Sequence, residues 1–146
     1  MGQLIRHGVF ETNSSSSHSI VVDRNGDYVG LTPDENNEIV IRPEDFGWNF
    51  DTYQNPEDKL AYLLIYIRDW IPVETMKLIY TKRLCDMVEE HTGASNVYLS
   101  GENGDGYIDH QSVEGGQLEE YFQDQGLMKD FVFGRKSILE TGHDND

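Results

Sequence analysis

The sequence contains one cysteine, Cys85, so no disulfide can form within the chain. A reducing compartment is therefore expected. Cys85 sits in the polar stretch of residues 82–86, without the Gly-rich or strand–turn surroundings of a nucleophilic thiol, and an ordinary helical cysteine is the better interpretation. With 146 residues the chain is nonetheless long enough to bury a core without disulfides or metal. We expect one domain over residues 1–146, ending in a flexible tail over residues 141–146.

Long apolar runs are also missing. The longest covers residues 60–67, well short of the roughly 18 residues that a membrane-spanning helix needs. The first six residues lack the apolar segment of a signal peptide, and Arg6 stands where a myristoylation signal requires Ser or Thr. We therefore expect no membrane association and a cytoplasmic location.

Basic residues are scarce, with 11 Lys and Arg against 27 Asp and Glu and a formal net charge of −16. No Lys or Arg occurs between Leu84 and Met128. This charge disfavours direct binding of DNA or RNA and favours a partner protein with a basic surface, including a surface that normally holds nucleic acid. The alternative is that the acidic surface only keeps the protein soluble. If a partner binds, we expect it to contact Glu89, Glu90, Glu114, Glu119 and Glu120.

The hydrophobic patterns predict an α+β domain in which an antiparallel sheet packs on two longer central helices. Strands are predicted at residues 3–10, 18–24, 38–42, 96–100, 107–110 and 130–133. Asn25 and Gly26 suit a hairpin turn, with residues 27–31 as the returning strand. The helices are predicted from Asn55-Pro56 to about Trp70, from Pro72 to Gly93, and over residues 117–124. Residues 43–54 are irregular and rich in aromatic side chains.

The most informative segment is the polar run from Glu11 to His18, which contains four consecutive serines. It lies between two predicted strands, cannot fill a core and contains no Gly. Small hydroxyls and backbone amides suit an anionic or polar ligand, and we expect the ligand-binding side chains to be Arg6, Glu11, Asn13, Ser14, Ser15, Ser16 and Ser17. His18 is a candidate general base or metal ligand. The alternative is that the Ser and Asn side chains satisfy their own turns and that His18 begins the next strand.

A second polar segment, residues 107–112, places Asp109 next to His110 at the predicted end of a strand. The pair could complete a site with His18, His110 acting as a second catalytic residue and Asp109 as a ligand-binding one. Residues 101–106 read as a Gly-rich hairpin turn, because the calcium-loop alignment places Gly101 and Ser112 where acidic ligands are required. No zinc spacing and no nucleophile elbow is present, so we expect no metal site and no cofactor.

Residues 6–19 (Arg-His-Gly-Val-Phe-Glu-Thr-Asn-Ser-Ser-Ser-Ser-His-Ser) resemble a recurrent opening in uncharacterised phage and prophage proteins. Residues 107–112 and 131–145 also resemble segments of that group, and the resemblance covers about a quarter of the chain. It brings no established activity and therefore no catalytic residue. It implies a phage origin, action inside the host cell and the convergence of the three blocks on one site.

Two functional hypotheses remain open. In the first, the chain is a small acidic phage-type protein that binds and inhibits a host protein, such as an antiviral-defence or nucleic-acid-handling factor. In the second, it is a small hydrolase or a nucleotide- or phosphate-binding protein that uses residues 14–18 together with Asp109 and His110. The acidic composition favours the first hypothesis, and the Ser-rich run favours the second.

Overall fold

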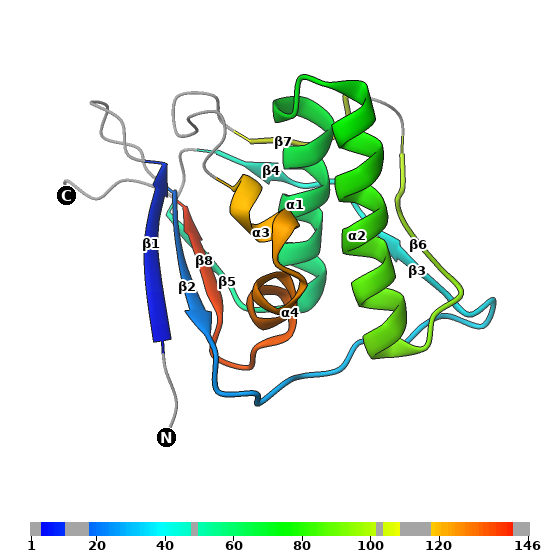
Figure 1. Ribbon diagram of the computed structural model, residues 1–146, viewed down its shortest axis with the longest axis horizontal. Helices are drawn as coiled ribbons and strands as arrows, with labels where there is room; N and C mark the ends of the chain where they lie inside the picture. The colour runs from blue at the N-terminus through cyan, green and yellow to red at the C-terminus, as the bar shows by residue number, and fades with distance from the viewer. Residues whose placement is uncertain (1–3, 11–17, 48–49, 102–103, 109–117, 142–146) are drawn as a thin grey trace.

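A four-stranded antiparallel sheet forms one side of the molecule (Figure 1). The computed structural model describes residues 4–10, 18–47, 50–101, 104–108 and 118–141, and of residues 4–10 it describes the backbone. The strand order is β1 (Leu4–Phe10), β2 (His18–Asp23), β8 (Ile138–Thr141) and β5 (Asp51–Tyr53). Alternation along β2 buries Ile20 and Val22 against the helices, as its sequence predicts.

The two long helices are α1 (Pro56–Trp70) and α2 (Glu74–Thr92). Asn55 and Pro56 begin α1 as predicted, although the Asn55 side chain makes no capping hydrogen bond. Residues 59–67 of α1 are all buried, which confirms it as the central helix. The second helix begins two residues later than expected and ends at Gly93, which takes the left-handed conformation (φ 82°) that glycine adopts at little cost. The α+β prediction with two long central helices is confirmed.

The strand predicted at residues 130–133 is wrong, because these residues end helix α4 (Gln125–Phe133). Asp124 caps this helix by accepting a hydrogen bond from the backbone N–H of Leu127. Helix α3 (Glu119–Gln123) immediately precedes it. Short apolar runs do not distinguish a strand from a buried helix, and here the run packs between the sheet and the long helices (Figure 1).

The remaining strands form two short parallel ribbons. Strand β3 (Glu38–Ile41) pairs with β6 (Asn96–Leu99), and β4 (Asp45–Phe46) pairs with β7 (Tyr107–Ile108). The hairpin predicted around residues 101–106 is therefore wrong, because β6 and β7 pair with different strands and not with each other in the described structure. Gly101, Gly104 and Gly106 still have the positive φ angles expected of a glycine-rich turn.

The hairpin predicted from Asn25-Gly26 is also wrong. Gly26 has the positive φ of 78° that a tight turn requires, but residues 27–31 do not return along β2. The two edges of β2 are occupied by β1 and β8. The segment instead bonds to the end of α4, with Val29 N–H donating to the Phe133 carbonyl and Arg135 N–H to that of Asp27.

Candidate functional site

Several strands end close together at one end of the sheet. Phe10, the last residue of β1, pairs with His18, the first residue of β2. Ser19 pairs with Glu140 of β8, and the next residue of β8, Thr141, pairs with Asp51 at the start of β5. Strands β1 and β2 overlap the first of the three sequence blocks and β8 overlaps the third, so these strands meet at the same end of the sheet (Figure 1).

The end of β7 lies at the same place. Phe46 of β4 pairs with Ile108, the last residue of β7, and the carbonyl of Gly47 lies 3.2 Å from Nε2 of His18. The last described residue of β7 therefore pairs with the strand whose next residue, Gly47, contacts His18. Asp109, His110 and Glu114 lie outside the described residues, as do Glu11, Asn13, Ser14, Ser15, Ser16 and Ser17, and the side chain of Arg6 is not described.

His18 is fully buried where β2 begins. Its Nδ1 lies 2.9 Å from the hydroxyl oxygen of Tyr62 on α1. Because the Gly47 carbonyl can only accept, Nε2 of His18 donates to it, and Nδ1 is paired with the Tyr62 hydroxyl. Both ring nitrogens of His18 therefore bond to groups within the fold. This arrangement indicates a structural role, in which His18 links β2 to α1 and to the residue after β4, rather than proton transfer to a substrate.

Aromatic rings connect His18 to a group of carboxylates. Phe46 meets the rings of Tyr62 and Tyr53 edge-on, at centroid distances of 4.9 and 5.1 Å. Tyr53 makes a side-chain hydrogen bond with Thr141, the last residue of β8. Burial, followed by the negative charge of Asp51 and then of Glu44, raises the pKa of Tyr53.

Four carboxyl groups surround Tyr53 and the start of α1, and we call them the carboxylate face: Glu44, Asp51, Glu57 and Asp58. Burial raises the pKa of Glu44 to about 8, with further contributions from a hydrogen bond to Asp58 and from the negative charges of Asp58 and Glu57. The raised pKa of Glu44 favours its protonated form near neutral pH, in which its carboxyl group can donate a hydrogen bond to Asp58. A cavity of about 460 Å³ opens here and is lined by Val40, Arg42, Pro43, Glu44, Glu57 and Asp58.

The predicted partner-binding residues do not gather at one place. Glu89 and Glu90 lie near the end of α2, whereas Glu119 and Glu120 begin α3. Phe122 of α3 stacks on Tyr80 of α2. Tyr80 lies nine residues before Glu89, which corresponds to about 13 Å along the helix axis. Of these four side chains, Glu90 and Glu120 are exposed and Glu89 and Glu119 are half-buried.

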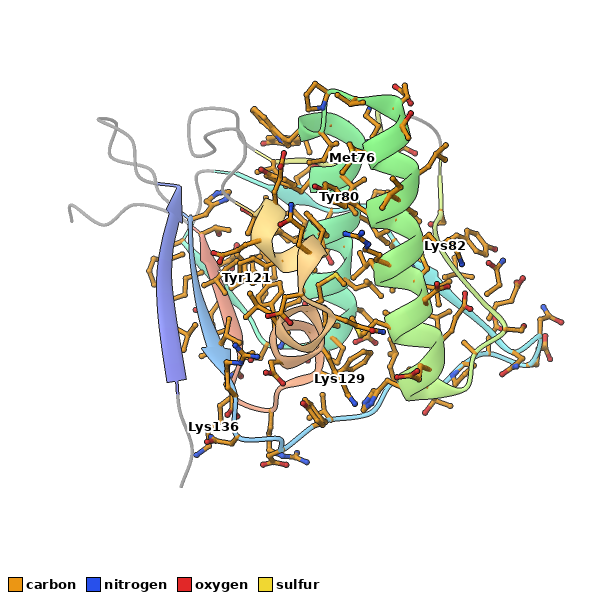
Figure 2. All side chains as sticks on the ribbon, viewed as in Figure 1. Met76, Tyr80, Lys82, Tyr121, Lys129 and Lys136 are labelled. Carbon is orange, nitrogen blue, oxygen red and sulfur yellow. The ribbon has the colours of Figure 1, made fainter. Side chains whose placement is uncertain are left out.

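Sequence reasoning missed the carboxylate face. Its signal was present, since five acidic residues and no Lys or Arg lie between Arg42 and Lys59. Some carboxylates elsewhere are paired with cations, for example Asp130 with Arg24 at 2.8 Å and Asp86 with Lys82 at 3.0 Å. Lys129 and Lys136 lie at the opposite end of the molecule from the place where β1 ends and β2 begins (Figure 2).

Within the described ranges, no group of three or more His, Cys, Asp or Glu side chains is placed to hold a metal ion. None of the helices in the described part of the chain combines the length and apolar character that a bilayer crossing requires. Comparisons with protein-family models, curated proteins and solved structures find no match for this chain.

Proposed function

We propose that this chain is a phage-type protein that acts in the cytoplasm of a host cell, where it binds and inhibits a host protein through a basic surface on that partner. The phage origin rests on the resemblance of the three sequence blocks. The binding surface we propose consists of the carboxylate face and the neighbouring Phe50.

The observation that carries the proposal is the exposure of Phe50 beside these carboxylates. The Phe50 side chain is 66% exposed and directly precedes Asp51, whereas Phe46 in the same aromatic segment is fully buried. Exposed aromatic side chains frequently anchor protein interfaces, because they bury a large apolar area at small entropic cost. Surrounding carboxylates would orient a partner that carries Lys or Arg around an apolar pocket.

The close approach of the Glu44 and Asp58 carboxyl groups, which form a hydrogen bond, supports the same proposal. Crowded carboxylates repel one another, and a cation brought close to them lowers that repulsion. Of the residues that line the cavity here, Arg42 is the basic one. A partner's Lys or Arg would therefore supply positive charge where the fold supplies little. Glu89, Glu90, Glu119 and Glu120 would add to the long-range attraction.

The test uses two variants that each replace three carboxyl groups by amides. The first carries Asp51→Asn, Glu57→Gln and Asp58→Asn, and the second carries Glu89→Gln, Glu90→Gln and Glu119→Gln. Proteins captured from bacterial lysate by the wild type are identified and then purified, and their affinities for both variants are measured at low and moderate salt. We expect the first variant to bind about tenfold more weakly and the second to bind nearly as well as the wild type.

Phe50→Ala provides an independent measurement, with Leu78→Ala as its control because Leu78 is 73% exposed on α2. Loss of affinity in Phe50→Ala alone supports the proposed surface. Equal binding by all variants, or capture of no salt-sensitive partner by the wild type, contradicts it. A loss of affinity confined to the Glu89–Glu90–Glu119 variant would contradict the proposed surface and indicate that the partner binds at α2 and α3 instead.

The convergence of strand ends favours a second candidate function, a nucleotide- or phosphate-binding protein or small hydrolase that uses the Ser-rich segment. Because His18 is part of the core, its substitution would destabilise the fold, and a loss of function could not be distinguished from a loss of folded protein. The better test changes Ser14, Ser15 and Ser16 to Ala and screens nucleotides and phosphate by thermal shift. A ligand that stabilises the wild type and not this variant would support the second function, and no stabilising ligand would contradict it.

A further inference from the structure

A separate cavity of about 290 Å³ lies between α1, α2 and β6, on the side of the long helices that faces the β3–β6 ribbon (Figure 1). Its apolar floor consists of Leu64, Ile67 and Val97, which belong to the hydrophobic core. Cys85 lines the cavity from α2, and its thiol donates to the Val97 carbonyl at 3.4 Å. Ligand sites are characteristically apolar concavities with a few well-placed polar groups, and this volume is at the small end of their range.

The charged residues that line this cavity are basic, in contrast to the acidic composition of the chain. Two cations, Lys77 and Arg68, contribute to its lining, and none of the described residues that line it is acidic. The chain as a whole has 27 acidic and 11 basic residues. The hydroxyl-bearing residues Thr81 and Ser100 also line the cavity.

The two cations differ in how firmly they are held. Nε and Nη2 of Arg68 donate to both carboxylate oxygens of Asp69, at 2.7 and 2.8 Å. The same guanidinium donates to the carbonyls of Asp105 and Gly106. Arg68 therefore fixes the wall of the cavity. Lys77 pairs with Glu74 at 3.4 Å, and the Glu74 side chain is 84% exposed. A long ion pair with so exposed a carboxylate is weak, so Lys77 can exchange this carboxylate for that of a ligand.

We infer that this cavity binds a small organic anion with an apolar body, whose carboxylate pairs with Lys77 near Thr81 and Ser100 and whose body lies on Leu64, Ile67 and Val97. The volume suits a molecule of roughly ten non-hydrogen atoms. This site is independent of the proposed partner-binding surface, because the two cavities have no lining residue in common.

Cys85 makes the inference testable, because it is the only cysteine in the chain and it lines the cavity. Burial raises the pKa of its thiol to about 11, so that it should react slowly with N-ethylmaleimide at neutral pH. An occupant that covers the thiol will slow this reaction further. The probes are octanoate, which has the required charge and size, and 1-octanol, which has the same chain without the charge.

We expect octanoate to slow the alkylation of Cys85 saturably in the millimolar range and 1-octanol to protect more weakly. Lys77→Met should raise the octanoate concentration for half-protection about fivefold and leave that for octanol unchanged. Lys82→Met is the matched control, because Lys82 lies on the same helix, is 75% exposed and is outside the cavity (Figure 2). It should behave as the wild type.

Three results would overturn the inference: no saturable protection of the wild type, equal protection by octanoate and octanol, or equal effects of Lys77→Met and Lys82→Met. The comparison of octanoate with octanol uses the wild-type protein alone, so it tests anion binding in the cavity even if a variant folds poorly. Circular dichroism at the highest probe concentration distinguishes protection from unfolding, and unfolding at that concentration also counts against a specific site.

Discussion

The buried lysine of α1 should give the protein an unusual dependence of stability on pH. Lys59 is fully buried, and its Nζ donates to the Ser137 carbonyl at 2.9 Å and lies 5.8 Å from the centre of the Phe131 ring. Burial lowers the pKa of Lys59 from 10.5 to about 8, against the opposing attraction of Asp23 and Asp58. The charged form of Lys59 is therefore costly in the folded state.

The direction of the effect follows from proton binding. Below pH 8, Lys59 is protonated in both the folded and the unfolded chain, and the folded state bears the full cost of the buried charge. Between pH 8 and pH 10.5, the folded state has released this proton and the unfolded state still holds it. The free energy of unfolding therefore rises with pH in this window. At about 1.4 kcal/mol for each pH unit, the Lys59 contribution is about 3 kcal/mol.

The experiment compares wild type with Lys59→Met, a substitution that keeps the length and apolar stem of the side chain. Urea unfolding is measured at intervals from pH 7 to above 10, and the difference between the two proteins is plotted. Burial also raises the pKa of Tyr62 well above its usual value, which lowers stability at high pH, but this effect is common to both proteins and cancels.

We expect the stability of the wild type relative to Lys59→Met to increase by about 3 kcal/mol across the window. The stability of the wild type relative to Lys82→Met, which removes an exposed lysine, should show no such increase. Parallel pH profiles for wild type and Lys59→Met would refute the argument, since they would mean that Lys59 titrates alike in the folded and unfolded chains.

Three further changes test other parts of the structure. Gly134→Ala should destabilise the protein by about 2–4 kcal/mol, because the added Cβ would collide with backbone and side-chain oxygens, whereas Gly30→Ala meets nothing within 4 Å; equal melting temperatures for the two variants would contradict this. Tyr62→Phe removes the hydroxyl that bonds His18 and should cost about 1–2 kcal/mol in urea unfolding, and an unchanged stability would show that the bond contributes nothing. Glu44→Gln should be more stable than wild type at pH 8 and lose this advantage toward pH 4.5, because the raised pKa of Glu44 makes folding less favourable as pH rises between these values; an advantage that persists at pH 4.5 would contradict the assignment.

The sequence predicted correctly those helices and strands that are determined by residues adjacent in the chain. Asn55-Pro56 before a long apolar run predicts the start of α1, and Gly93 predicts the end of α2. Alternation along β2 predicts its buried face. In each of these cases the residues favour the same local structure in any fold that buries an apolar face. No contact with a distant segment is needed to select that structure.

The errors arose where a distant partner decides the structure. Residues 130–133 have the apolar character of a strand, yet the cap at Asp124 and burial between the sheet and α1 make them helical. Gly26 forms a real turn, but β8, more than a hundred residues away, takes the edge of β2 that a hairpin would need. Parallel pairs such as β3 with β6 leave no turn signature in the sequence.

The candidate site shows the same division. The composition alone established an acidic chain with polar segments around His18 and His110, because charge and residue type do not depend on the fold. Only the tertiary structure decided that His18 is a buried partner of Tyr62, that burial and a hydrogen bond to Asp58 raise the pKa of Glu44, and that Phe50 is exposed. Burial and proximity set these properties, and both arise from contacts between segments that the order of residues keeps apart.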